Sequence, residues 1–223
     1  MKPILACSCL LVATLAGCKD DAPKPDTTGT SRSEVVKATG TQQTAAPSTP
    51  AKHAPPPPSA PRKLCDKEPA AAGTKLPTAK LEHLEAAGSP ALGDRIPTGG
   101  RWTWVNFWAA WCGPCKEEIP RLKQFEQKLA QGGTPITLAF VSLDDDQRQA
   151  QKFLDSQPNA GLRSTWWLPE GKRGAWTSDL KMKSDPSLPV QLLFDPSGAL
   201  RCIIDGAVED GDLPQIQAIV SRR

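Results

Sequence analysis

Cys112 and Cys115 are the residues whose types and spacing are best suited to chemistry, because two cysteines that flank Gly113-Pro114 can close a disulfide and open it again. The first turn of a helix has unpaired backbone N–H groups and a partial positive charge, and both stabilise a thiolate. We therefore predict that Cys112 is the nucleophile. Cys115, one turn further on and turned inward, is predicted to resolve the mixed disulfide, while Pro114 fixes the helix start without losing a needed N–H.

The alternative for such a pair is half of a structural zinc site, which needs two further Cys or His ligands at suitable spacing. The sequence offers no second pair of ligands. His53 lies in a Pro-rich segment, His83 precedes the first dense apolar run, and Cys65 and Cys202 each stand alone. We therefore expect the dithiol to work with no metal and no organic cofactor.

A predicted strand and a predicted helix position the dithiol. The strand is the aromatic and apolar run 102–108, which favours a largely buried strand. After Pro114, apolar residues recur every three or four positions, as on one face of a helix, until Gly132-Gly133 ends it. These residues are Ile119, Leu122, Phe125 and Leu129.

The rest of the chain continues the alternation of strands and helices, which predicts an α/β domain. A second apolar run, 136–143, precedes a helical stretch with Ala150, Phe153 and Leu154 on its buried face. The runs 190–194 and 200–204 are joined by a turn sequence, 195–198, and predict an antiparallel hairpin. A last helix is expected to turn Leu213, Ile216, Ile219 and Val220 inward. Segment 159–186 has no clear period and predicts only a short strand and a short helix.

The N-terminus has the pattern of an exported lipoprotein. A short charged start precedes the apolar run 4–16, which is too short to span a bilayer as a mature helix. The residues 15–18, Leu-Ala-Gly-Cys, resemble the lipobox of bacterial lipoproteins, in which the cysteine is lipidated and begins the mature chain. This predicts a signal peptide at 1–17 and lipidation of Cys18. The alternative, a buried N-terminal helix, would have nothing to pack against in the polar sequence that follows.

Residues 19–61 contain mostly Thr, Ala, Ser, Lys and Pro, and they cannot bury enough apolar surface to fold. We therefore predict a signal peptide at 1–17, a lipidated and disordered tether at 18–63, and one folded domain at 64–223. Lys and Arg exceed Asp and Glu by only 27 − 24 = 3, and the basic residues are scattered. Nucleic acid is therefore not expected as a partner.

The sequence 105–120, VNFWAAWCGPCKEEIP, resembles the TlpA/ResA branch of thioredoxin-like proteins, and the resemblance extends from about Leu76 to the C-terminus. It implies a thioredoxin-like α/β fold with a central mixed sheet flanked by helices. The branch contains membrane-tethered, extracytoplasmic thiol-disulfide oxidoreductases, often reductants of apocytochrome c or of other exported disulfides. The implied protein faces the periplasm from a lipid anchor, reduces exported protein disulfides, and is itself reduced by a membrane electron donor. We expect a monomer.

The resemblance also implies roles for two further residues. Leu188-Pro189 becomes the cis-proline loop that lies against the dithiol, and Glu118 becomes the acidic residue that assists proton movement there. Without the resemblance, Pro189 is a strand-start proline and Glu118 is an exposed carboxylate on a helix. Asn106 stands where cytosolic thioredoxins keep a buried Asp, and this favours Glu118 or water as the proton acceptor.

Four other residues have open assignments. Trp108 is expected to pack in the core, whereas Trp111 is expected to be half exposed and to shape a docking surface. Cys65 and Cys202 can form a structural disulfide in an oxidising compartment, although two free thiols remain an alternative.

Two other functions use the same features. A lipid-tethered binding or scaffold module would retain the fold without catalysis, although an intact dithiol argues against it. An oxidase that introduces disulfides would use Cys112 and Cys115 with the opposite redox poise. The sequence also leaves open whether the outer or the inner membrane holds the anchor.

Overall fold

The strand β2 (Trp102–Trp108) leads directly to the dithiol, and all seven of its residues are buried. Its aromatic and β-branched side chains suit a strand that is covered on both faces. The structure is a computed structural model, and it describes residues 62–65 and 73–221, all within the unit Pro55–Arg223. The predicted signal peptide, Cys18 and the predicted tether as far as residue 61 lie outside the described residues.

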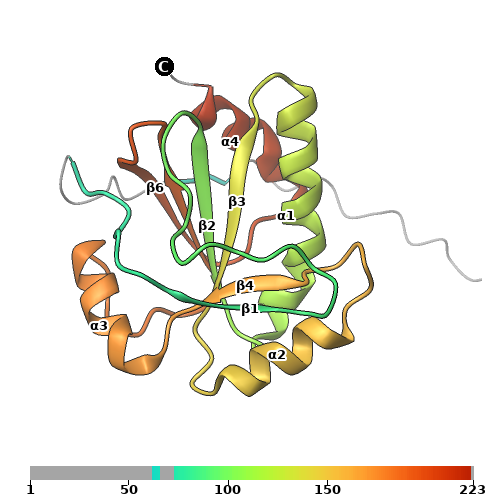
Figure 1. The fold of residues 1–223 in the computed structure, drawn as a ribbon. Helices are drawn as coiled ribbons and strands as arrows, with labels where there is room; N and C mark the ends of the chain where they lie inside the picture. The colour runs from blue at the N-terminus through green and yellow to red at the C-terminus, as the bar shows by residue number, and fades with distance from the viewer. Residues whose placement is uncertain (1–61, 66–72, 222–223) are drawn as a thin grey trace, which may run out of the picture. The chain divides into compact units, whose positions relative to one another are not determined.

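The described residues form one mixed sheet of six strands in the order β1-β4-β3-β2-β5-β6 (Figure 1). The central strands β4, β3 and β2 are parallel, whereas β1, β5 and β6 run antiparallel to their neighbours. The other strands are β1 (Glu82–Glu85), β3 (Ile136–Ser142), β4 (Ser164–Trp167), β5 (Val190–Phe194) and β6 (Leu200–Asp205). This topology confirms the predicted α/β fold with a central mixed sheet.

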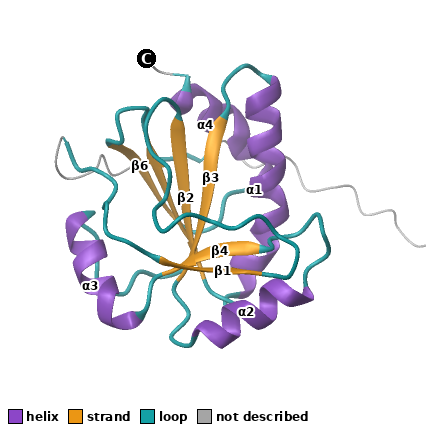
Figure 2. Cartoon of the chain, viewed as in Figure 1, coloured by secondary structure: helices purple, strands orange, loops and turns teal. Residues whose placement is uncertain are grey.

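Helices cover both faces of the sheet, with α1 and α3 on opposite sides (Figure 2). Apolar side chains of α1, α2 and α4 share one buried cluster, and those of α3 belong to a second cluster beyond the sheet. The helices are α1 (Gly113–Gln131), α2 (Gln147–Ser156), α3 (Glu170–Asp179) and α4 (Leu213–Val220), with a short 3₁₀ helix, η1 (Asp210–Asp212), before α4. The sheet therefore lies between two apolar layers.

The alternation of side chains along β2 decides what faces α1. Trp104 and Trp108 belong to the cluster on the α1 side, while Val105 and Phe107 belong to the cluster on the α3 side. Asn106 falls between the two tryptophans in this alternation, because successive strand residues point to opposite faces. A polar side chain is therefore buried under α1.

The structure defines elements that local sequence patterns left open. Segment 159–186 contains β4 and α3, and β1 was not predicted. The four residues of β1 include no alternation of apolar and polar side chains, so their pairing with β4 depends on the neighbouring strand and not on a local pattern. In α4, Ile216 and Val220 are buried as expected, but Leu213 and Ile219 are only half-buried.

The start of the described domain is fixed to its C-terminal part. Cys65 and Cys202 are joined by a disulfide, with their Cα atoms 5.1 Å apart. Arg62, which the sequence prediction assigns to the tether, donates a hydrogen bond to the carbonyl of Ala207 and forms an ion pair with Asp212. Arg62, two residues before the predicted boundary, therefore contacts the domain.

Candidate active site

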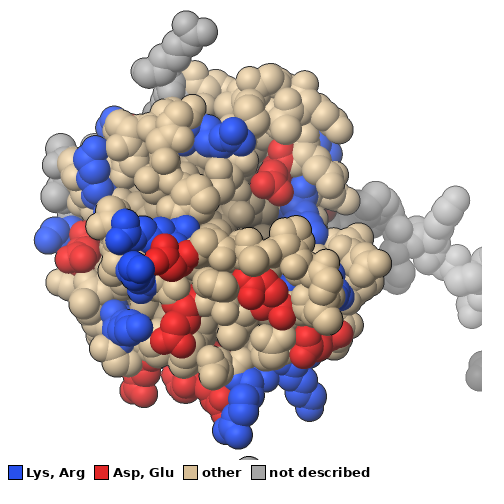
Figure 3. All heavy atoms as spheres, in the orientation of Figure 1, with Lys and Arg blue, Asp and Glu red and all other residues tan. Residues whose placement is uncertain are grey.

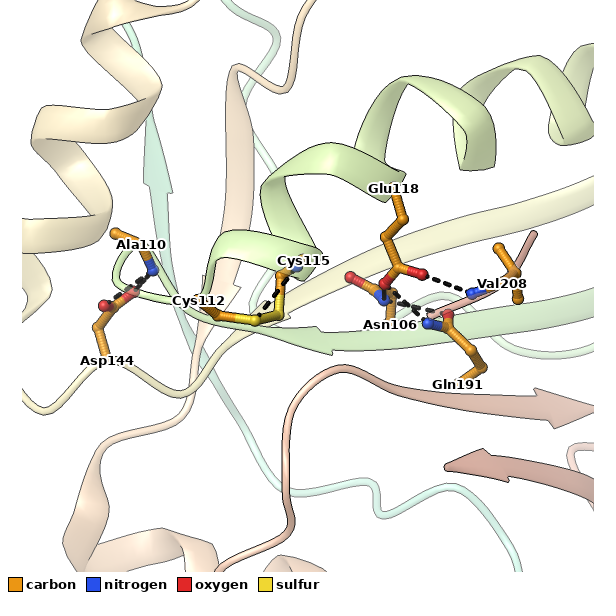
Figure 4. The surroundings of a disulfide bond; sticks show 8 residues. All are labelled: Asn106, Ala110, Cys112, Cys115, Glu118, Asp144, Gln191 and Val208. Carbon is orange, nitrogen blue, oxygen red and sulfur yellow. Dashed lines mark hydrogen bonds between the residues drawn. A yellow bond between two sulfur atoms is a disulfide. The ribbon is translucent and has the colours of Figure 1, made fainter. Parts of the chain in front are cut away.

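Cys112 and Cys115 form a disulfide at the beginning of α1 (Figure 4), with their Cα atoms 5.3 Å apart. Cys112 is the N-cap residue, with an extended backbone, and its Sγ accepts a hydrogen bond from the N–H of Cys115 at 3.2 Å. Ser and Asp satisfy the same first-turn donors when they cap helices. In the reduced form this N–H is therefore placed to stabilise a thiolate at Cys112.

The two sulfurs differ in accessibility. Cys112 retains 5% of its surface, whereas Cys115 is completely buried. The neighbouring Trp111 is 63% exposed, and Trp108 is completely buried. Of the two cysteines, only Cys112 therefore has surface that another molecule can touch, and it lies next to the exposed Trp111.

Glu118 lies one turn after Cys115 on the buried face of α1 (Figure 4). Its Oε1 accepts hydrogen bonds from Asn106 Nδ2 and Gln191 Nε2, both at 2.8 Å. Its Oε2 accepts one from the N–H of Val208 at 2.9 Å. Glu118 is completely buried, so it is not the exposed helix carboxylate that the sequence left as an alternative.

Burial raises the pKa of Glu118, and the hydrogen bonds from Val208, Gln191 and Asn106 lower it by less. The carboxylate therefore holds a proton to higher pH than an ordinary glutamate does. A buried carboxyl with a raised pKa, one turn from a dithiol, is a candidate for proton transfer.

Gln191 is a site residue that the sequence analysis did not identify. It lies in β5, directly opposite Asn106 of β2. Its Oε1 accepts hydrogen bonds from Trp104 Nε1 at 2.9 Å and from Asn106 Nδ2 at 3.0 Å. The sequence did contain one signal for this residue, a glutamine between the apolar residues Val190 and Leu192. A polar side chain inside a buried strand needs a buried hydrogen-bond partner.

Pro189 lies at the end of the sheet that carries the dithiol. The Leu188-Pro189 peptide bond is cis, and Val190 begins β5 immediately afterwards. Val190 pairs with Phe107, one residue before the end of β2. The antiparallel register therefore brings the cis-proline loop to the same edge of the sheet as the segment that leads into Cys112.

Asp144, in the loop after β3, is a second buried carboxylate that sequence reasoning missed. Both of its oxygens accept hydrogen bonds from the N–H of Ala110 at 3.0 Å, and Oδ2 also accepts one from Ser142 Oγ at 2.8 Å. Burial raises the pKa of Asp144, and the bonds from Ser142 and Ala110 partly offset this effect. Asp144 therefore fixes the backbone at Ala110, two residues before Cys112 (Figure 4).

Other features of the described residues lie away from the dithiol or are spread over the surface. No group of three or more His, Cys, Asp or Glu side chains suited to a metal occurs among the described residues. On the face in Figure 3, acidic and basic side chains of the described part of the chain are interspersed. A hollow of about 460 Å³ is lined by residues including Lys123, Glu126 and Trp166, and neither cysteine of the dithiol lines it. Within residues 62–65 and 73–221, no helix is long and apolar enough to cross a membrane.

Part of this chain is similar to known proteins. Residues 100–200 match a family model described as thioredoxin-like. The chain is 31% identical over 109 residues to the thiol-disulfide oxidoreductase ResA of Oceanobacillus iheyensis, a match that covers 49% of this chain and 52% of ResA. It is 30% identical over 116 residues to the thioredoxin-like protein YneN of Bacillus subtilis, which covers 52% of this chain and 63% of YneN. The matches thus span between half and two thirds of these relatives.

A solved structure supports the same fold. The thioredoxin domain of a thiol-disulfide oxidoreductase from Bacteroides vulgatus matches with a TM-score of 0.50 and 20% identity, covering 68% of this chain and 99% of that domain. Residues 100–200, which include the dithiol, are thus similar to thioredoxin-like proteins. The relatives of the chain support a place in the TlpA/ResA-like branch, which confirms the resemblance seen in the sequence.

Proposed function

We propose that this chain is a membrane-anchored thiol-disulfide oxidoreductase that reduces disulfides of exported proteins, with Cys112 and Cys115 as its redox centre. The main observation behind this proposal is the geometry of the pair. Cys112 caps α1 and keeps a small exposed surface, whereas Cys115 is completely buried. The similarity to ResA, which is named a thiol-disulfide oxidoreductase, supports the same class of reaction.

In the proposed cycle, the Cys112 thiolate attacks one sulfur of a substrate disulfide, and the substrate S–S bond breaks as a mixed disulfide forms. The released substrate sulfur takes up a proton. Cys115 then loses its proton and attacks Cys112 Sγ, which breaks the mixed disulfide and closes Cys112–Cys115. The substrate gains two electrons and two protons, and the dithiol loses them.

Each cycle leaves the dithiol oxidised, so the reduced form must be restored. The proposed donor is an integral membrane electron carrier that returns two electrons, with two protons from solvent. The substrate class that the TlpA/ResA resemblance favours includes apocytochrome c among exported disulfide proteins. Glu118 is proposed to accept the proton of Cys115, and Pro189 to present backbone to the substrate chain.

Anchoring is a separate part of the proposal. Residues 1–17 would direct export, Cys18 would carry acyl chains, and residues 19–61 would hold the domain away from the membrane. The Cys18→Ser chain is expected to lose incorporation of a labelled fatty acid and to leave the membrane fraction. Retention of both label and membrane association would contradict lipidation at Cys18.

The redox direction is tested by the reduction potential of Cys112–Cys115 in the full chain, titrated against a dithiothreitol buffer, with Cys112→Ser as the control. A value near that of thioredoxin, about −270 mV, is expected for a dedicated reductant. A value near −120 mV, roughly that of DsbA, would instead identify an oxidase. Absence of a reversible two-electron titration would leave only a binding module.

A further inference from the structure

A buried oxygen beside the dithiol lacks a hydrogen-bond partner. Asn106 is completely buried, and its Oδ1 accepts no hydrogen bond from any described residue. The other end of the same amide is fully used, since Nδ2 donates to Glu118 Oε1 and to Gln191 Oε1. Buried polar atoms nearly always have partners, and an unpaired one destabilises the state in which it occurs.

The orientation of this amide is fixed by its neighbours. The indole N–H of Trp104 can only donate, so Gln191 must present Oε1 to it, at 2.9 Å. Asn106 Nδ2 then faces two acceptors, Gln191 Oε1 at 3.0 Å and Glu118 Oε1 at 2.8 Å. Turning the Asn106 amide over would place Oδ1 against both of those oxygens. The unpaired atom is therefore the oxygen, and it points away from Glu118 and Gln191.

The side chain best placed to donate to this oxygen is Cys115. Figure 4 draws the oxygen of Asn106 on the side of the amide toward Cys115. The buried residues of α1 are Cys115, Glu118, Ile119, Leu122, Phe125 and Leu129. Four of these six are apolar, and Glu118 already accepts from Asn106. Cys115 lies one turn before Glu118, and in the disulfide its sulfur has no proton to donate.

We propose that Asn106 Oδ1 is the hydrogen-bond acceptor of the Cys115 thiol in the reduced form, so that reduction satisfies an oxygen that the disulfide leaves unpaired. The inference rests on the proposed redox role of the dithiol and adds a residue to it. The bond stabilises the reduced form and keeps the proton on Cys115. Cys112, whose sulfur accepts the N–H of Cys115, is then the thiolate that meets the substrate.

The S–H stretching band of Cys115 tests the bond directly. In a full-length chain with Cys7, Cys9, Cys18 and Cys112 replaced by serine, Cys115 is the single thiol and Cys65–Cys202 stays closed. Infrared spectra are expected to show a band lowered by hydrogen bonding, and Asn106→Leu should raise it to the frequency of a free thiol. Gln191→Met is the matched control, because it removes a donor to Glu118 but leaves Asn106 Oδ1, and it should keep the parental band.

Two spectroscopic results would overturn the inference. The first is a free-thiol band in the chain that retains Asn106. This result needs no substitution at position 106, so it counts even if the Asn106→Leu chain does not fold. A lowered band that persists in Asn106→Leu would mean that the thiol donates elsewhere, for example to a backbone carbonyl of α1.

The reduction potential gives an independent readout. In the chain that lacks Cys7, Cys9 and Cys18 but keeps the dithiol, Asn106→Leu is expected to shift the equilibrium about fivefold toward the disulfide, which is about 20 mV more negative. Gln191→Met should shift it less than about twofold. Equal shifts of the reduction potential in the two variants would assign the effect to the loss of a donor to Glu118 and would contradict the inference. Neither the infrared band nor the reduction potential involves a substrate protein. A chain that gives both expected results but reduces no exported disulfide would therefore contradict the proposed function and leave this inference standing.

Discussion

The Oε2 of Glu118 accepts a hydrogen bond at 2.9 Å from the backbone N–H of Val208, a residue 90 positions later in the chain. Val208 is completely buried, and the carbonyl of the preceding Ala207 accepts a hydrogen bond from Arg62. The carboxylate on the first helix is thus held by the loop that follows β6 as well as by β2 and β5. Its burial, and the raised pKa that follows from burial, depend on all three.

Glu118→Gln is expected to remove a pH dependence from the step in which Cys115 resolves the mixed disulfide. Burial raises the pKa of Glu118, so the carboxylate that can accept the Cys115 proton forms only above the ordinary range of glutamate. The rate of the unchanged chain should therefore rise with pH through that region, and the variant should lack this rise. Stopped-flow fluorescence of the reduced chain mixed with a disulfide peptide measures the rate. Glu117→Gln, an exposed neighbour, is the control and should keep the rise.

Asp144→Ala is expected to destabilise the chain by about 2 kcal/mol, because it leaves the N–H of Ala110 and the hydroxyl of Ser142 without their buried acceptor. Urea unfolding followed by tryptophan fluorescence gives the free energy of unfolding. Asp145→Ala removes an exposed carboxylate paired with Arg173, and it should cost less than about 1 kcal/mol. Equal losses in the two variants would refute the role given to Asp144.

Replacing both Cys65 and Cys202 by serine is expected to lower the free energy of unfolding by about 2 to 5 kcal/mol. The disulfide joins residues separated by 137 positions, and a cross-link that closes a long loop restricts the unfolded chain strongly. The comparison is Cys112→Ser with Cys115→Ser, which opens a link between residues only 3 positions apart. Urea unfolding should show the larger loss for the first pair, and the reverse order would contradict this account.

Asp195→Asn is expected to change how stability depends on acid pH. Burial by itself raises the pKa of Asp195, but hydrogen bonds from Ser197, Ala199 and Arg201 outweigh it and lower the pKa from 3.8 to about 2. A lowered carboxyl pKa contributes stability above the unfolded value, and this contribution is lost as pH falls through the folded value.

Between pH 4 and pH 2 the unchanged chain should therefore lose about 2 kcal/mol that the Asp195→Asn chain does not lose. Asp185→Asn, which replaces an exposed aspartate outside the turn, should retain the acid loss of the unchanged chain. Urea unfolding at both pH values makes the measurement. If the free energy of unfolding fell equally with pH in the Asp195→Asn chain and in the unchanged chain, the turn would not stabilise the Asp195 carboxylate.

Local sequence patterns were sufficient to predict several parts of this protein. The Cys-Gly-Pro-Cys spacing placed a dithiol at a helix start, and α1 begins at Gly113. The apolar run 102–108 predicted the strand before it, and the turn sequence 195–198 predicted the hairpin of β5 and β6. Each of these features involves residues a few positions apart, so short-range geometry is sufficient to predict it.

The surroundings of the dithiol could not be predicted in this way, because they depend on long-range packing. Glu118 could have been exposed, and it is buried because β2 and β5 present Asn106 and Gln191 to it. Asp144 lies among consecutive acidic residues, yet it alone of 144–146 is completely buried, beneath the segment before Cys112. These contacts join residues 12 to 90 positions apart. Such pairs are set by strand register and helix packing, which a single sequence does not encode in any local period.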